Sequence, residues 1–308
     1  MRQAIGSGTL SDVRARLLLI ASLGLLAACH GGPTPGKPGG PTGTIRFVAN
    51  GTIREIDLAT RKVADVRPGR DPASASTGED VWVSEEKKIC GTTAEDRCIM
   101  VAGTDGRGVI SLKSCKGCEL ASISPDGNFL AYAGYCREKV CGASSHATFV
   151  RDRHGKLLHV FPSLGAPTWT PKNELVLAGD SLQGKVGLYL AVDHVHEVRV
   201  DTDLADPKEL SVSPDGKRVA FKMSGGDGQA YVVPLAGGEP PKKLTDLKDR
   251  TIGWPTFSPD GKWIVFENKE RSWQDGVLTI VSADGGGMTP LVDDARKPVA
   301  GGGRLQWR

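Results

Sequence analysis

No stretch of this sequence is apolar over enough residues to cross a membrane as a helix. The longest mainly apolar segment, residues 17–28, covers twelve positions, whereas a membrane-spanning helix needs about 20. Beyond the N-terminal segment, apolar residues nowhere follow the helical period over three turns, which argues against a helical fold. Excess positive charge is also missing, because the net charge of +3 falls to +1 once the three arginines and one aspartate of residues 1–28 are removed. We therefore expect no binding of nucleic acid.

The sequence also lacks the motifs of several catalytic classes. A serine hydrolase of the prolyl-peptidase kind needs a Gly-x-Ser-x-Gly elbow, and the nearest approach, residues 142–146, lacks the second glycine. There is no Cys-x-x-Cys-His motif for covalent haem, and the Asp-Gly turns lack the alternating acids of a calcium loop. His194 and His196 fall at an expected turn, where we do not expect them to converge with other ligands. The sequence thus predicts no catalytic residue, no bound metal and no cofactor.

A tetrapeptide does recur at a regular interval. Three copies read Ser-Pro-Asp-Gly, and a divergent copy stands between the first two; the four are residues 124–127, 170–173, 213–216 and 258–261. Their prolines are 46, 43 and 45 residues apart, a period typical of repeat architectures. Serine, proline and glycine at these positions favour a tight turn, and the apolar runs on both sides predict a β-hairpin.

A second turn follows the first by about 20 to 26 residues in these repeats. Each repeat then has two hairpins and four strands, which is one blade of an all-β propeller. We count six blades, with a fifth, divergent copy of the first turn after Val81-Trp82-Val83-Ser84 and a sixth at Leu305-Gln306-Trp307-Arg308. The strand around Trp307 should pair with the strand around Phe47 and close the first blade, which covers the free sheet edges. The alternative, a β-sandwich with coincidental turns, does not account for three identical turns in phase.

The repeat resembles a known family. Ser-Pro-Asp-Gly, two variable residues, an apolar residue, alanine and an aromatic, with a later Asp-Gly turn, is similar to the WD40-like repeat of TolB-type six-bladed β-propellers, and the resemblance covers about residues 44–308. It implies an all-β fold of six four-stranded blades. It says less about activity, since such propellers serve as protein-binding scaffolds, as lids of peptidases and as lyases. In TolB a separate N-terminal α/β domain precedes the propeller, and we expect no room for one here.

Residues 1–28 have the pattern of a bacterial lipoprotein signal peptide. Arg14 and Arg16 precede the apolar stretch, which is short enough for a signal peptide. The stretch ends in Leu26-Ala27-Ala28-Cys29, which resembles the lipobox and implies cleavage before Cys29 and lipidation of that residue. The alternative is an ordinary signal peptide with an incidental cysteine. Residues 29–43 then form a lipidated, Gly/Pro-rich tether that holds the propeller off the membrane.

The residue after the predicted lipidation site indicates which membrane would hold the lipoprotein. His30 follows Cys29 where an aspartate would retain a lipoprotein in the inner membrane. In bacteria with that sorting rule, the sequence implies anchoring in the outer membrane, facing the periplasm. Where the rule does not hold, either membrane fits. In both cases we expect a membrane contact through lipid alone.

Six cysteines remain after Cys29, an even number that predicts disulfides in an exported chain. Six cysteines allow fifteen connectivities; proximity in the sequence favours Cys90–Cys98, Cys115–Cys118 and Cys136–Cys141. In a four-stranded blade, the loops between second and third strands and the connections between blades lie on one face. All six cysteines fall in such segments of blades two and three. The resulting cysteine-bearing face is either stapled for stability or stiffened for a partner.

Side chains on that face are the remaining candidates for recognition, because arginine and tryptophan are over-represented at binding hot spots. The candidates are Arg70, Arg250, Trp254, Arg271 and Trp273. The alternative for each is a solvated loop residue or a packed aromatic. We expect a monomeric, lipid-anchored envelope propeller that binds a protein or envelope partner without catalysis. The alternative is a carbohydrate-active or hydrolytic enzyme with a site at the channel mouth.

Overall fold

The computed structural model describes most of the chain beyond residue 38. The described residues are 39–90, 96–103, 110–136, 141, 146–180, 185–200, 204–224, 227–270 and 276–308. The predicted signal peptide, the predicted lipidation site Cys29 and most of the predicted tether lie outside them, as do Arg271 and Trp273. Within the described ranges, no helix combines the length and the apolar character needed to span a membrane.

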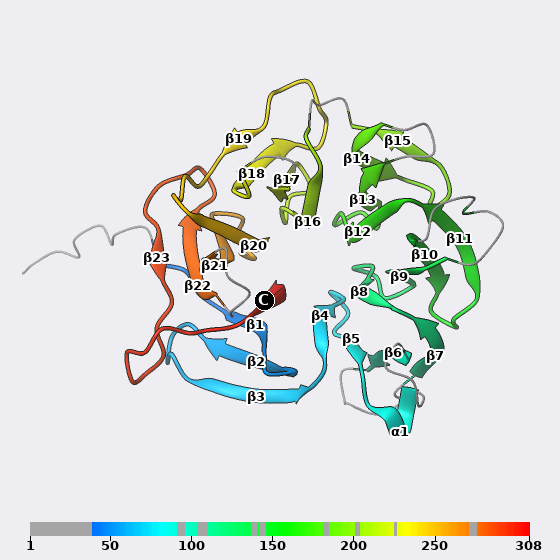
Figure 1. Ribbon diagram of the computed structural model, residues 1–308, viewed down its shortest axis with the longest axis horizontal. Helices are drawn as coiled ribbons and strands as arrows, with labels where there is room; N and C mark the ends of the chain where they lie inside the picture. The colour runs from blue at the N-terminus through cyan, green and yellow to red at the C-terminus, as the bar shows by residue number, and fades with distance from the viewer. Residues whose placement is uncertain are drawn as a thin grey trace, which may run out of the picture. The chain divides into compact units, whose positions relative to one another are not determined.

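Six four-stranded antiparallel sheets form the blades of a ring, as the repeats predict (Figure 1). From the innermost strand outward, blade one contains β24 (Gly302–Trp307), β1 (Thr44–Ala49), β2 (Thr52–Asp57) and β3 (Val63–Pro68). Blade two contains β4 (Arg70–Ser74), β5 (Asp80–Ser84), β6 (Asp96–Ala102) and β7 (Ile110–Lys116). Blade three contains β8 (Glu119–Ile123), β9 (Phe129–Tyr135), β10 (His146–Asp152) and β11 (Leu157–Pro162).

The other three blades repeat this order. Blade four contains β12 (Leu164–Trp169), β13 (Leu175–Asp180), β14 (Val186–Ala191) and β15 (Glu197–Arg199). Blade five contains β16 (Pro207–Val212), β17 (Arg218–Met223), β18 (Ala230–Pro234) and β19 (Lys242–Lys243). Blade six contains β20 (Arg250–Phe257), β21 (Trp263–Glu270), β22 (Val277–Ser282) and β23 (Thr289–Pro290). The short helix α1 (Lys87–Cys90) lies in the connection between β5 and β6.

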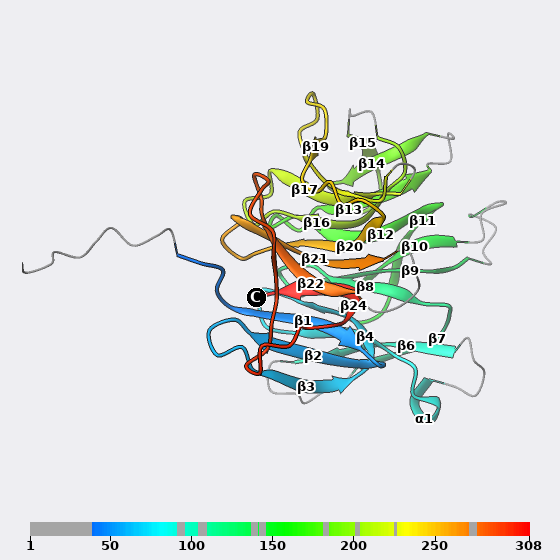
Figure 2. The ribbon, with the colours of Figure 1, turned by 60° about the vertical axis from the view of Figure 1, so that its left-hand side comes forward.

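The C-terminal strand closes the ring. β24 lies beside β1 and pairs with it antiparallel (Figure 2). Trp307 lies opposite Ile45 in this pair. The Trp307 indole N–H donates to the Thr42 carbonyl at 2.8 Å, and the backbones of Thr44 and Arg308 exchange hydrogen bonds of 2.8 and 2.9 Å. The first blade is therefore built from both ends of the propeller sequence, as predicted.

The repeated tetrapeptide forms the turn between the first and second strands of a blade. In the copy at 213–216, the Ser213 hydroxyl donates to the Asp215 carboxylate at 2.6 Å and accepts the Arg218 N–H at 2.9 Å. Gly216 has a φ of 71°, which favours glycine. The turns at 124–127 and 258–261 have the same hydrogen bonds. The motif therefore encodes a turn in which each polar side chain is satisfied locally.

The divergent copy keeps the turn with different residues. Asn173 adopts a φ of 65° where the other copies have glycine, which asparagine tolerates better than most residues. The Thr170 hydroxyl donates to the Glu174 carboxylate at 2.9 Å, so that Glu174 replaces the missing aspartate.

The fifth copy of this turn was misplaced in the sequence prediction. Val81–Ser84 belongs to β5, the second strand of blade two, and not to its first strand. The first strand is β4, and residues 75–79 form the turn, where Gly78 has a φ of 99°. Lys88 lies in α1. The prediction failed because this turn lacks proline and aspartate, which left the apolar run as the only signal.

The apolar core lies between the blades. A cluster of buried side chains fills each of the six interfaces between neighbouring blades. In the interface that closes the ring, Phe47 and Trp307 of blade one pack with Val265 and Ile280 of blade six. Each blade is thus covered on both faces, and the inner strands are left to line a central channel.

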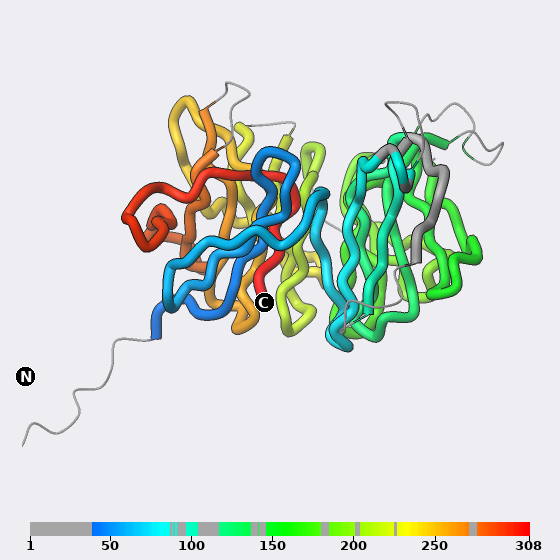
Figure 3. The backbone as a smooth tube through the Cα atoms, turned by 90° about the horizontal axis from the view of Figure 1, so that it is seen from below, coloured from blue at the N-terminus to red at the C-terminus, as the bar shows by residue number. Residues whose placement is uncertain are grey.

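Turns and loops form the two opposite rims of the ring (Figure 3). The Ser-Pro-Asp-Gly turns and the turns between third and fourth strands share one rim, which we call the turn face. The loops between second and third strands and the connections between blades share the other rim, the cysteine-bearing face. This arrangement follows from the up-and-down order of the strands within each blade.

Candidate binding site at the channel mouth

All six inner strands carry a β-bulge at the level of the channel wall. Each shows a shift in its register with the second strand of its blade. Each also holds one residue at a positive φ between 51 and 70°: Asp71, Leu120, Ala166, Glu209, Trp254 and Gly303. Bulges of this kind re-aim side chains and leave a backbone group unpaired in the ladder. Five of these residues are not glycine, so the bulges hold backbone strain around the channel.

Two carboxylates, the buried Asp71 and the partly buried Glu209, satisfy backbone groups at the bulges of neighbouring blades. Asp71 accepts the Leu120 N–H at 2.8 Å, and Glu209 accepts the Trp254 N–H at 2.8 Å. Burial raises the pKa of Asp71, although the Leu120 N–H and the Arg304 charge act in the opposite direction. Burial likewise raises the pKa of Glu209, against the charge of Lys222, whose Nζ lies 3.7 Å away. Both acids are therefore held at the channel by structural hydrogen bonds.

Arg304, from the closing strand β24, reaches across the channel at the level of the bulges. Nη1 of Arg304 donates to the carbonyls of Leu120 and Ala121 at 3.0 and 2.9 Å, and Nη2 donates to the Pro167 carbonyl at 3.0 Å. These carbonyls belong to blades three and four, whereas Arg304 belongs to blade one. Burial lowers the pKa of Arg304 to about 10, which leaves it charged at neutral pH. Arg304 thus ties the C-terminal strand to the far side of the ring.

Two cavities open at the channel mouth on the cysteine-bearing face. One of about 600 Å³ is bordered by blades one to three, and includes Arg70, Asp71, Glu85 and Glu119. The other, of about 500 Å³, is bordered by blades three to five. Trp254 borders both. The mouth therefore combines one central aromatic side chain with charged side chains from several blades.

Ion pairs arrange the charged side chains at the rim of this mouth. Glu85 accepts from Arg70 at 2.9 Å and from Arg97 at 3.1 Å. On blade six, Arg250 contacts Glu270 at 3.3 Å. These groups are partly exposed, so each pair contributes little to folding stability. Their value for recognition lies in charge complementarity, which sets partner choice and association rate.

Disulfides hold the loops beside the mouth. Cys90 is bonded to Cys98, and Cys136 is bonded to Cys141; both pairs agree with the pairing that proximity favours. Cys118 is disulfide-bonded as well, whereas the side chain of Cys115 lies outside the described part of the chain. These cysteines belong to blades two and three, on the face that the strand order predicts.

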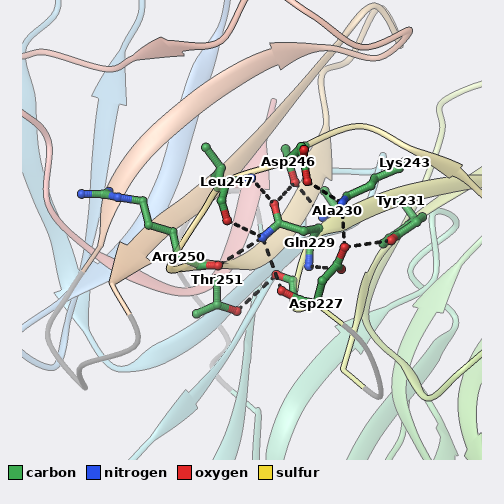
Figure 4. A network of polar contacts seen from close by, with 11 residues as sticks. Asp227, Gln229, Ala230, Tyr231, Lys243, Asp246, Leu247, Arg250 and Thr251 are labelled. Atoms are coloured by element: carbon green, nitrogen blue, oxygen red, sulfur yellow. Dashed lines mark hydrogen bonds and ion pairs between the residues drawn. The ribbon is translucent and has the colours of Figure 1, made fainter.

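A hydrogen-bond network holds the same face of blade five, where no cysteine occurs. Gln229 is 2% exposed. Its amide nitrogen donates to the carbonyls of Leu247 and Arg250, each at 3.1 Å, and its amide oxygen accepts the Thr245 hydroxyl at 2.8 Å and the Leu247 N–H at 2.9 Å (Figure 4). The network fixes the connection into blade six against the loop that precedes β18.

The structure places the predicted recognition residues in three different settings. Arg70 and Arg250 begin the inner strands β4 and β20, at the rim of the cysteine-bearing face. Trp254, which was expected among the loop segments of that face, lies within β20, at the bulge and in the channel wall. Arg271 and Trp273 lie outside the described residues. The position of Trp254 was missed because a bulge depends on contacts between blades and has no local sequence signal.

Asp71, Glu209 and Arg304 were not among the predicted recognition residues. Asp71 and Arg304 are ordinary residues of an expected connection and a terminal strand, and Glu209 lies in an unremarked first strand. Counting back from each Ser-Pro-Asp-Gly turn places Glu209 and Trp254 at equivalent positions, five residues before proline. This shared spacing could have predicted that the two residues occupy equivalent positions around the channel. Among the described residues, no group of three or more histidine, cysteine or acidic side chains is placed to hold a metal ion.

Comparison with known proteins supports this architecture. No known protein-family model matches the sequence. The chain is 32% identical over 147 residues to an uncharacterized peptidase, YuxL, from Bacillus subtilis (strain 168), and the match covers 46% of this chain and 20% of that protein. The crystal structure of TolB from Acinetobacter baumannii aligns with 86% of this chain and 65% of its own, at 20% identity and a TM-score of 0.64. A putative TolB from Agrobacterium tumefaciens aligns with 86% of this chain and 92% of its own, at 19% identity and a TM-score of 0.63.

The two TolB structures define the class to which the fold belongs. The chain folds as a six-bladed β-propeller similar to that of TolB, and the resemblance predicted from the repeats is confirmed at the level of fold. This chain spans 20% of the length of the peptidase and 65% of the length of the Acinetobacter TolB. Propellers of one fold carry different functions, so function has to be argued from the channel mouth.

Proposed function

We propose that the chain is a non-catalytic scaffold that binds a protein partner at the channel mouth on the cysteine-bearing face. The observation that carries this proposal is the convergence of Trp254 and charged side chains from several blades on two cavities of about 600 and 500 Å³. Tryptophan and arginine are the side chains that most often dominate binding energy. Disulfides beside the mouth reduce the ordering cost of binding.

The proposed setting is the bacterial cell envelope. The lipobox-like segment ending in Cys29 and the Gly/Pro-rich segment after it support a lipid-anchored, periplasm-facing protein. The TolB-like fold and the disulfides agree with an exported protein. Cleavage and lipidation are tested directly by mass spectrometry of the N-terminal peptide from membranes, with Cys29→Ser as the control that should stay unlipidated.

Site-specific photo-crosslinking in cells tests the binding face. A photoreactive residue at Arg70 or Lys208 is predicted to give a discrete crosslinked product, because both positions border the mouth cavities. The same residue at Lys217, on the exposed Ser-Pro-Asp-Gly turn of the opposite face, should give none. Identical products from both faces, or none from the mouth, would contradict the proposed function.

A hydrolytic enzyme is the second candidate. The observation that favours it is the 32% identity over 147 residues to a protein described as a peptidase. Turnover of peptide and glycan substrates by the purified chain, together with its metal content, distinguishes the two. Turnover that Trp254→Ala abolishes would favour the enzyme over the scaffold.

A further inference from the structure

A third cavity lies in the channel on the turn face, away from the mouth described above. Its volume is about 430 Å³, within the range that encloses small organic ligands. The prolines of four turns border its opening: Pro125, Pro171, Pro214 and Pro259. Among the described residues that border it, Arg304 carries the sole charged side chain. The cavity is thus a mainly neutral chamber with one cation.

The hydrogen bonds of Arg304 to the protein leave two of its N–H groups unused. A guanidinium has five N–H groups, and three of them donate to the backbone carbonyls of Leu120, Ala121 and Pro167. Among the described residues, no acceptor contacts Nε–H or the second N–H of Nη2. Nε–H and an N–H of Nη2 lie side by side on one edge of a guanidinium, and that edge can bind a carboxylate through two parallel hydrogen bonds.

The charge of Arg304 is also without a contacting counter-ion in the described part of the chain. Asp71 acts on this cation through its charge, but the two groups do not form an ion pair. Neutral carbonyls therefore supply all of its direct partners. Arg304 is partly buried, and a cation that is partly removed from water is stabilised by a paired anion. The site therefore favours an anionic ligand.

Two hydroxyl groups border the cavity beside the carbonyls that hold Arg304. Ser122 follows Ala121 and Thr168 follows Pro167, and both residues border the cavity. Neither hydroxyl has a hydrogen-bond partner among the described residues. Thr256 shows the contrast: it is also the first paired residue after its bulge, but its hydroxyl donates to the Trp254 carbonyl at 3.0 Å.

We propose that this cavity binds a small hydroxylated carboxylate of the sugar-acid class. The carboxylate accepts hydrogen bonds from Nε–H and Nη2–H of Arg304, and hydroxyl groups of the ligand bond to Ser122 and Thr168. A hydroxyl both donates and accepts, which matches a serine or threonine partner. The volume of the cavity accommodates one sugar ring. This inference does not rest on the proposed function, since it concerns the opposite end of the channel.

Calorimetric titration of the full-length chain with D-glucuronate tests the ligand class. Glucuronate is predicted to bind at least about tenfold more tightly than D-glucose, which lacks the carboxylate, and than acetate, which lacks the hydroxyls. Because Trp169, Trp254 and Trp307 border the cavity, tryptophan fluorescence should follow the same binding curve. Absence of glucuronate binding up to about 10 mM, or equal binding of glucose or acetate, would overturn the proposal.

Substitutions then locate the site. Thr168→Val and Ser122→Ala should each weaken glucuronate binding by about three- to tenfold. Thr256→Val, at the corresponding position of blade six, should leave the affinity within about twofold, since its hydroxyl is already bonded to the backbone. Arg304→Lys keeps the charge but loses the two-donor edge, and should abolish binding.

The hydroxyl variants keep the test decisive if Arg304→Lys does not fold. Equal affinities of Thr168→Val, Ser122→Ala and Thr256→Val would place glucuronate elsewhere and overturn the site. The photo-crosslinks at the opposite mouth report on the scaffold function alone. A failure of glucuronate binding would therefore leave the scaffold function standing, and a failure of crosslinking would leave the ligand site standing.

Discussion

At the scale of single residues, the repeated turn shows why four residue types recur together. Serine bonds both the aspartate and a backbone N–H five residues further on, and glycine supplies the positive φ. All of these contacts lie within one turn. The motif could therefore be interpreted from the sequence without knowledge of the fold. Where it diverges, at 170–174, a different pair of side chains makes the equivalent bond.

Ser213→Ala tests the structural value of this turn. The substitution leaves the Arg218 N–H without its side-chain acceptor and removes the bond to Asp215, so we expect the free energy of unfolding to fall by about 1–3 kcal/mol. Lys217→Ala, in the same turn but with an exposed side chain, should change it by less than about 0.5 kcal/mol. Urea denaturation of both variants measures the difference; equal losses would mean that the serine contacts are not stabilising.

The turn aspartates also predict a pH dependence. Hydrogen bonds from the serine hydroxyls lower the pKa of Asp215 and Asp260 below the ordinary value. The ionised carboxylates therefore stabilise the folded state above an unfolded pKa of about 4, and this contribution is lost as the pH falls through the lower folded pKa. The free energy of unfolding of Asp260→Asn should accordingly fall less steeply than that of the wild type between about pH 4 and 2. Urea titrations over this range with unchanged slopes would refute the assignment.

At the scale of structural elements, the inner strands depend on contacts between blades. Asp71 of blade two satisfies Leu120 of blade three, and Glu209 of blade five satisfies Trp254 of blade six. Partners 45 or more residues apart in the sequence leave no local pattern. Hairpins could be predicted from turn residues and apolar runs, whereas bulges, and with them the placement of Trp254 in the channel wall, could not.

The Gln229 network predicts that a single substitution destabilises the connection into blade six. Gln229→Leu has nearly the same size but strands the Leu247 N–H and two backbone carbonyls that the amide now satisfies. We expect a loss of about 1–3 kcal/mol in the free energy of unfolding. We also expect faster hydrogen exchange of the Leu247 amide. Gln306→Leu, in β24 and outside this network, is the control and should leave the Leu247 amide unchanged.

At the scale of the whole molecule, the fold rests on six equivalent interfaces and one closing strand. The number of blades, the two-ended first blade and the face that bears the cysteines could all be predicted, because they follow from the period and the up-and-down strand order. The side-chain contacts inside the channel could not be predicted. Arg304 reaches backbone carbonyls of residues 120, 121 and 167 from the opposite end of the sequence, and only closure of the ring brings these groups together.

Closure by β24 is therefore the claim on which the channel, its mouth and the placement of Arg304 all depend. Native-state hydrogen exchange, measured amide by amide under mild denaturant, tests it without altering the sequence. Ile45 and Arg46 lie in β1, between β24 and β2. Their amides and those of residues 305–307 should exchange only through global unfolding, with the same opening free energy as the inner strands β8 and β12. Exchange of residues 305–307 through a separate, low-energy opening would contradict a ring closed by its C-terminal strand.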